Sequence, residues 1–185
     1  LAVHGAFEGK QGIVMIAGTG SISIGRVAKG KLVRCGGWGI ELDDEGSGAW
    51  IGREGLTAVV RGIDGRGKST ALTDKLMDLF PTIDIEKPRT IVKAYAERSF
   101  EYQMLTPVVM QCAEEGDDVC MGIIDRASQH LIELLTALAP QYKLKQIPVA
   151  LMGGMIDAET ILENRLDKLI KKDKKFKRVE PKGSA

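Results

Sequence analysis

Residues 12–48 read GIVMIAGTGSISIGRVAKGKLVRCGGWGIELDDEGSG, and this glycine-dense stretch decides how the rest of the chain is interpreted. It opens with the apolar run 12–17, which has the length and composition of a buried strand. Two segments of alternating polarity follow, at residues 21–27 and 31–34. The intervening Ala28-Lys29-Gly30 predicts that these two segments form a hairpin.

A glycine turn, Gly18-Thr19-Gly20-Ser21, joins the apolar run to the hairpin. Glycine has no Cβ and accepts positive φ, so such a turn lets backbone N–H groups come close to an anion. A lone GTGS sequence is also a common tight turn that binds nothing. Taken alone, the turn therefore leaves both interpretations open.

A second glycine cluster, CGGWG at residues 35–39, leads into a run of acidic side chains: Glu41, Asp43, Asp44 and Glu45. Each part has an explanation without a ligand. The cluster can be loop packing, and the carboxylates can cap the helix predicted to begin after residue 48. A phosphate-type turn followed by a carboxylate loop with an aromatic residue, in this order and spacing, favours a binding site.

The stretch GIVMIAGTGSISIG…RCGGWG…DDEGSGAWIGREGL resembles the core of the N-acetylglucosamine kinase branch of the BadF/BadG/BcrA/BcrD ATPase family, which shares a superfamily with actin and Hsp70. The resemblance implies an α/β fold of the ribonuclease H-like (actin-like ATPase) kind, with a mixed sheet and a helical insert at about residues 64–140. It also implies that residues 1–185 are a fragment, the C-terminal domain of a longer kinase. The N-terminal ATPase domain, with the presumed catalytic aspartate, would then lie upstream of Leu1.

The activity implied by this resemblance is ATP-dependent phosphorylation of an amino sugar, N-acetylglucosamine first and glucosamine second, with Mg²⁺ screening the phosphates. The implied ATP-binding residues are Gly18, Thr19, Gly20, Ser21, Gly153 and Gly154. The implied sugar-binding residues are Thr19, Gly37, Trp38, Asp44 and Glu45. No metal ligand and no catalytic residue is expected within residues 1–185, so this chain alone is expected to transfer no phosphate.

Two positions depart from the family pattern, which is close to GGWGHxxGDEGS. Ile40 stands in place of the histidine, and Asp43 stands in place of the glycine before Asp44. An added carboxylate beside the pocket is expected to change which sugar is preferred.

Two other functions stay open. The family also contains activators of 2-hydroxyacyl-CoA dehydratases, which hydrolyse ATP beside a bridging iron–sulfur cluster. These need cysteines next to the glycine turn, and residues 18–24 contain none. A non-catalytic module that senses sugar is the other alternative, because it needs no catalytic aspartate.

A second segment matches the sequence of a phosphate-binding motif but lacks the structural context that the motif requires. Residues 62–69, GIDGRGKS, satisfy the P-loop pattern GxxxxGK[ST]. That pattern requires a strand before it and a helix after it. The preceding residues 49–63 have apolar positions at helical spacing, so we interpret residues 62–69 as a loop between two helices.

The remaining segments are predicted to alternate between helix and strand. Residues 93–140 are predicted to be mostly helical, residues 147–152 to form a strand that ends in Gly153-Gly154, and residues 158–170 to form a helix. The basic tail 168–182 is interpreted as the end of that helix followed by a solvated loop. Residues 181–185 resemble the start of a closing helix.

Composition limits the classes of function. The apolar fraction of 44% and charged fraction of 28% are ordinary for a soluble globular protein, and a net charge of +1 favours neither nucleic acid nor an anionic membrane as partner. No run reaches the roughly 18 apolar residues that span a bilayer. We interpret the three cysteines, Cys35, Cys112 and Cys120, as reduced thiols of a cytoplasmic protein. The expected partners are the amino sugar and the protein's own N-terminal half, and a homodimer is left open.

Overall fold

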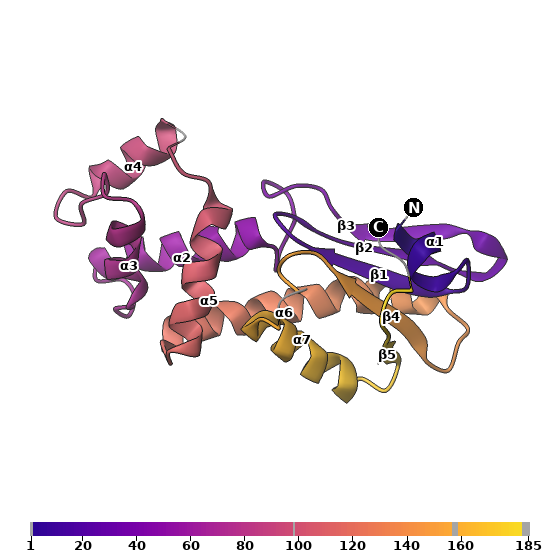
Figure 1. The fold of residues 1–185 in the computed structure, drawn as a ribbon. Coiled ribbons are helices and arrows are strands. Elements are labelled where there is room, and N and C mark those ends of the chain that lie inside the picture. The colour runs from indigo at the N-terminus through magenta and orange to yellow at the C-terminus, as the bar shows by residue number, and fades with distance from the viewer. Residues whose placement is uncertain (1, 98, 157–158, 183–185) are drawn as a thin grey trace.

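The computed structural model describes residues 2–97, 99–156 and 159–182, and within them a five-stranded sheet of order β3-β2-β1-β4-β5. Strand β2 (Ser21–Arg26) pairs antiparallel with both of its neighbours, β1 (Gly12–Ala17) and β3 (Leu32–Gly36). Strand β4 (Ile147–Met152) is parallel to β1, and β5 (Phe176–Arg178) is parallel to β4. The sheet is therefore mixed, and the expected α/β fold is confirmed (Figure 1).

The central strand β1 is apolar along its whole length because both of its faces are covered. Val14 packs with Val3, Ala6 and Phe7 of the short helix α1 (Ala2–Phe7) on one face. Ile13 and Met15 point to the other face and join the larger core. Two helices, α6 (Asp118–Leu138) and α7 (Ile161–Lys172), cover that second face (Figure 1).

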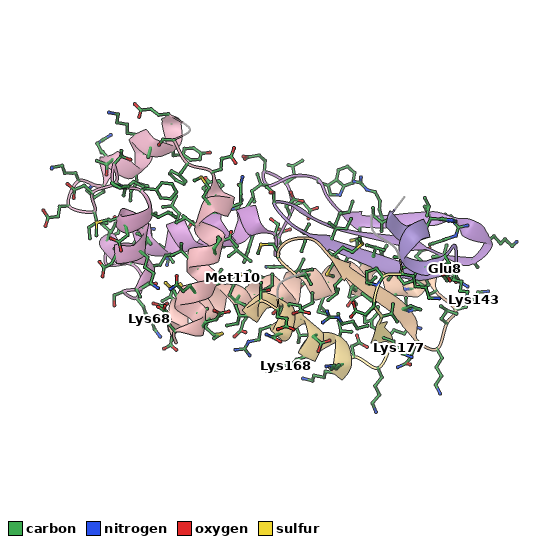
Figure 2. The ribbon with its side chains drawn as sticks, viewed as in Figure 1. Glu8, Lys68, Met110, Lys143, Lys168 and Lys177 are labelled. Carbon is green, nitrogen blue, oxygen red and sulfur yellow. The ribbon has the colours of Figure 1, made fainter. Side chains whose placement is uncertain are left out.

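The connection from β3 to β4 is helical. Its helices are α2 (Gly48–Ile63), α3 (Leu72–Leu79), α4 (Arg89–Ala96), α5 (Thr106–Glu114) and α6, with the short 3₁₀ turns η2 (Tyr102–Leu105) and η3 (Ala139–Gln141). Helices α3 and α4 stand away from the sheet, and α5 crosses between them and α6; Met110 of α5 marks this crossing in Figure 2. The expected helical insert is confirmed. Its last helix, α6, contacts β2 and β3, so the insert also supplies part of the layer beneath the sheet.

The P-loop-like residues 62–69 form the last two residues of α2 and the loop that follows, so they connect two helices as interpreted from the sequence. Helix α2 ends at Ile63, and α3 begins at Leu72. The turn is closed by hydrogen bonds from the N–H groups of Arg66 and Gly67 to the carbonyl of Arg61. No strand precedes the motif, so its phosphate-binding interpretation does not apply. Among the described residues, no helix is both long enough and apolar enough to cross a membrane.

Two expectations for the C-terminal region were wrong. Part of the presumed solvated loop is strand β5, with Phe176 buried opposite Ile147, because Arg178 forms ion pairs with Glu163 and Asp167 of α7 and fixes the segment there. Helix α7 begins at Ile161 rather than 158, because the hydroxyl of Thr160 accepts a hydrogen bond from the N–H of Glu163 and caps it. Asp157, Ala158 and residues 183–185, which include most of the expected closing helix, lie outside the described residues.

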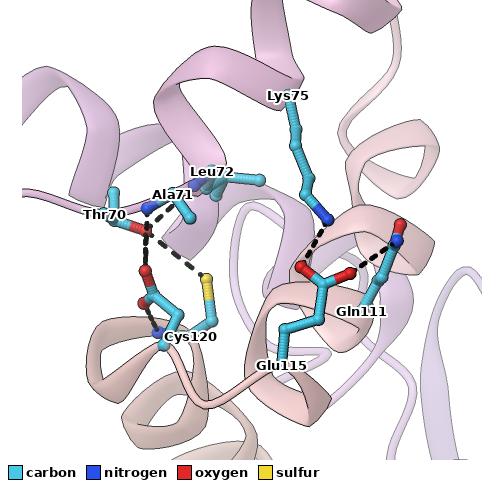
Figure 3. Close-up of polar contacts among 8 residues, drawn as sticks. Thr70, Ala71, Leu72, Lys75, Gln111, Glu115 and Cys120 are labelled. Carbon is cyan, nitrogen blue, oxygen red and sulfur yellow. Dashed lines mark hydrogen bonds and ion pairs between the residues drawn. The ribbon is translucent and has the colours of Figure 1, made fainter.

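One carboxylate, that of Asp117, ties two helix starts together (Figure 3). Its Oδ1 accepts the N–H of Cys120 at 2.9 Å and caps α6. Its Oδ2 accepts the N–H of Ala71 at 2.8 Å and the hydroxyl of Thr70 at 2.9 Å, just before α3. Burial by itself would raise the pKa of Asp117, but these hydrogen bonds to its charged form hold the pKa below its usual value. This joint between the starts of α3 and α6 therefore depends on the ionised carboxylate of Asp117.

Replacing Asp117 with Ala is expected to lower the free energy of unfolding by about 2 kcal/mol, because one helix cap and two further hydrogen bonds to a charged group are lost. Urea denaturation at pH 7 measures the change. Asp118→Ala is the matched control: Asp118 is the next residue along, is exposed, and should cost less than about 0.5 kcal/mol. Equal losses in the two variants would contradict the role given to Asp117.

The same joint predicts a pH dependence. Since folding lowers the pKa of Asp117, its contribution to stability is complete above the ordinary carboxyl value of 3.8 and is lost as the pH falls through the lowered value. The difference in unfolding free energy between the wild type and Asp117→Asn should therefore shrink below pH 3.8. Denaturation curves at a series of pH values from about 6 to about 2.5 test this, and a constant difference would refute it.

Candidate functional site

The turn Gly18–Thr19–Gly20–Ser21 connects β1 to β2 and lies against the first turn of α2. The N–H of Gly18 donates to the carbonyl of Gly20 at 2.9 Å, which closes the turn. The carbonyls of Gly18 and Thr19 accept the N–H groups of Gly48 and Ala49 at 2.8 and 3.0 Å. Two of the N–H groups that a helix start leaves without helical partners are thus used to hold the turn. Thr19 itself is exposed.

Asp44 brings the acidic loop into contact with this turn. Its side chain is only 8% exposed, and its Oδ1 accepts the N–H of Ser21 at 3.3 Å. A Cβ placed on Gly20 would lie 2.7 Å from Asp44 Oδ2, so only glycine leaves room for the carboxylate here. Asp44 has a φ of +60°, a conformation that non-glycine residues adopt rarely and that is concentrated at functional sites.

Glu45 and Ser21 add a second link between the loop and the turn. The hydroxyl of Ser21 donates to the carbonyl of Glu45 at 3.0 Å. The contact of Glu45 with the turn is thus made by its backbone, while its side chain is half-buried. The two halves of the motif that the sequence singled out, the glycine turn and the acidic loop, therefore meet at Asp44 and Glu45.

The loop that carries Gly37 and Trp38 is held from two sides. The N–H of Trp38 donates to Asp43 Oδ2 at 3.1 Å, and the guanidinium of Arg53 on α2 donates to the carbonyl of Ile40 at 3.0 Å. The Trp38 ring is 67% exposed, and the guanidinium of Arg34 lies 4.2 Å from its centre. The carboxylate of Asp43, expected to influence sugar choice, bonds to the backbone of its own loop.

Gly153 and Gly154 follow β4, beside the end of β1. A Cβ on Gly153 would lie 2.4 Å from the carbonyl oxygen of Ala17, and Gly153 has a φ of +108°. Gly154 is exposed and has nothing within 4 Å of its Cβ position. The glycine pair and the turn therefore share the carboxyl edge of the parallel strands β1 and β4, the edge at which α/β sheets bind ligands.

Three supporting residues were not found from the sequence. Arg53 anchors the Trp38 loop, as described, and Thr106 of α5 donates its hydroxyl to the carbonyl of Gly48 at 2.6 Å. The N–H of Met155 donates to the carbonyl of Ala17 at 3.2 Å. All three come from elements outside the glycine-dense stretch, so no local pattern could have indicated them. Among the described residues, no group of three or more His, Cys, Asp or Glu is arranged to hold a metal ion.

A family model for the BadF/BadG/BcrA/BcrD ATPases matches residues 1–183. The chain belongs to this family. The resemblance seen in the glycine-dense stretch is thereby confirmed, and it extends over nearly the whole chain.

Relatives of known name share the same region. The chain is 30% identical over 172 residues to an N-acetylmuramic acid/N-acetylglucosamine kinase of Clostridium acetobutylicum, covering 92% of this chain and 56% of the relative. It is 32% identical over 178 residues to an N-acetyl-D-glucosamine kinase of Dictyostelium discoideum, covering 92% and 55%. The chain spans about half the length of these curated relatives.

A solved structure shows a similar fold. A protein of Chromobacterium violaceum, provisionally assigned as an N-acetylglucosamine kinase, superposes with a TM-score of 0.78 at 28% identity. The match covers 99% of this chain and 59% of that one. Over the matched region, this chain thus has the actin-like ATPase fold of the family.

The close approach of Gly153 to Ala17 predicts a difference between the two neighbouring glycines. Gly153→Ala should lower the free energy of unfolding by about 1–3 kcal/mol, because the new Cβ meets a backbone oxygen and the φ is strained for alanine. Gly154→Ala, with open space at its Cβ, should change it by less than about 0.5 kcal/mol. Urea denaturation of both variants measures this. Similar values for the two would contradict the packing described.

Proposed function

We propose that the complete protein transfers the γ-phosphoryl group of ATP to an amino sugar. The preferred substrate is N-acetylglucosamine, and glucosamine is the second choice. The observation that carries the proposal is the contact between Asp44 and the glycine turn, because it brings a sugar-binding group and a phosphate-binding group together. Two relatives support the same activity, since one is named an N-acetylmuramic acid/N-acetylglucosamine kinase and the other an N-acetyl-D-glucosamine kinase.

The glycine turn is proposed to bind the phosphates. Its N–H groups at Thr19 and Gly20 donate to no other described residue, and Thr19, which carries a hydroxyl, is exposed. Such N–H groups and a hydroxyl are donors suited to phosphate oxygens. Gly153 and Gly154, at the same edge of the sheet, are proposed to lie against the adenosine. The tight packing of Gly153 on Ala17 and the open space at Gly154 fit a flat group placed there.

The acidic loop is proposed to bind the sugar. Asp44 Oδ2 accepts no hydrogen bond from the described residues, and an ionised carboxylate only accepts, so it suits a sugar hydroxyl. Glu45 is assigned the same role. Gly37 and the exposed Trp38 are proposed to hold the N-acyl group, and Asp43 and Arg53 would keep their loop in place.

When bound, ATP supplies the phosphoryl group, and Mg²⁺ offsets the charge on its oxygens. We propose that Mg²⁺ is held mainly by the phosphates, because it usually binds through substrate phosphates and one or two carboxylates rather than in a cage of protein ligands. The general base is proposed to be an aspartate in the part of the family's kinases that this chain does not span. Residues 1–185 would then bind and orient both substrates, and deprotonation of the sugar hydroxyl would depend on that other part.

The direct test is a kinase assay of the complete natural chain that contains residues 1–185, with ATP and Mg²⁺. N-acetylglucosamine should be phosphorylated with the highest kcat/KM, followed by glucosamine and then glucose. ATP hydrolysis without transfer to any of these sugars would contradict the proposal and favour an activator of the dehydratase type.

Asp44→Asn tests the site itself. Replacing the buried carboxylate with an amide should lower kcat/KM for N-acetylglucosamine about 100-fold, since about 2.7 kcal/mol is typical for the loss of one charged hydrogen bond at a reacting centre. Glu41→Gln is the matched control, because Glu41 is an exposed carboxylate of the same loop; its kcat/KM should stay within about twofold. If Asp44→Asn lowers only sugar affinity, in a chain that phosphorylates no sugar, the sensing function is favoured.

A further inference from the structure

A groove of about 560 Å³ lies between α6 and α7. These two helices are on the face of the sheet opposite to α1 (Figure 1). This face is distinct from the carboxyl edge of β1 and β4 that carries the candidate site. Its charged lining from α6 is Asp125, Arg126 and His130, and its lining from α7 includes Arg165, Lys168 and Lys172. Lys168 is labelled on α7 in Figure 2.

The groove has an excess of positive charge. Asp125 is the one carboxylate among its lining residues, and its Oδ1 lies 3.3 Å from Arg165 Nε. Arg126 pairs with Glu54 of α2 at 2.9 Å, and His130 Nδ1 lies 3.3 Å from Glu133. Lys168 and Lys172 form no ion pair with any residue that the structure describes. The groove therefore holds two cations that nothing in the described chain neutralises.

The spacing of these two lysines makes the arrangement unfavourable without a ligand. They stand four residues apart on α7, where like charges on the helix surface repel each other. The helix dipole favours Lys172, in the last turn, but Lys168 lies one turn earlier, where that effect has faded. An anion between α6 and α7 would offset the repulsion.

The groove is connected to the candidate site through one aromatic residue. The ring of His130 packs edge-on against Trp50 with centroids 5.2 Å apart, and the Arg126 guanidinium lies 5.8 Å from the same ring. Trp50 is in the first turn of α2, directly after the two residues whose N–H groups hold the carbonyls of Gly18 and Thr19. A ligand in the groove would thus lie one side chain away from the helix turn that fixes the glycine turn.

We propose that this groove binds a small phosphate monoester, in its dianionic form. The volume is that of a small-molecule site. The two uncompensated lysines match a charge of −2. Arg126 and Arg165 are paired with Glu54 and Asp125, but each guanidinium has five N–H donors and so retains donors for a phosphate oxygen. Gln129, which is exposed at the same groove, can bond to the hydroxyls of the esterified alcohol. The phosphate ester of a sugar and a nucleoside monophosphate share this chemistry.

Isothermal titration calorimetry of the complete natural chain, at constant ionic strength, tests the proposal without any activity measurement. The probes are glucose 6-phosphate, AMP, glucose, sulfate and inorganic phosphate. We expect saturable binding of at least one of the two monoesters, whose relative affinity identifies the source, and weaker binding of glucose, which lacks the phosphate. Sulfate or inorganic phosphate binding as tightly as the monoesters would overturn the assignment.

Two double variants locate the binding. Lys168→Ala with Lys172→Ala should raise the Kd of the monoester at least tenfold. Lys174→Ala with Lys177→Ala removes the same charge from exposed positions outside the groove and should change the Kd less than twofold. The thermal unfolding of both variants is measured to verify that they fold. Equal weakening by the two pairs, or no saturable binding of either monoester, would overturn the proposal.

Discussion

The hydrogen bonds from the first N–H groups of α2 to the carbonyls of Gly18 and Thr19 are the interaction on which the site depends. They join the sheet to the helical insert at the point where β1 ends. The N-terminus of a helix offers donors that its own turns cannot use, and here two of them hold a loop rather than a ligand. Thr106 fastens the same helix start from α5, so the position of the glycine turn is set by the sheet and the insert together.

Asp44 is the second constraint, because it occupies the space that a side chain at Gly20 would need. A buried carboxylate in a left-handed conformation, bonded to the N–H of Ser21, is costly to keep unless it has a use. Asp43 and Arg53 hold the neighbouring loop by backbone hydrogen bonds, so the exposed Trp38 projects from a fixed support. The proposed sugar site is thus built from one buried acceptor and one exposed ring.

The groove between α6 and α7 and the candidate site are connected through Trp50, which contacts His130 of the groove and lies in the first turn of α2. The electrostatics of the two places are opposite: carboxylates gather beside the turn, and cations gather between α6 and α7. Each therefore suits a different ligand.

Local patterns in the sequence determined β1, the hairpin of β2 and β3, β4 and the long helices α2 and α6, because strand and helix periods are set by neighbouring residues. The family could also be predicted, since the motifs that carry the resemblance lie in one continuous stretch. Only the tertiary structure decided three other features. These are β5, which depends on Arg178 meeting Glu163 and Asp167; the Asp117 joint; and the contact of Asp44 with Gly20. Each depends on groups far apart along the chain, whose approach is fixed by packing of the whole fold rather than by any local pattern.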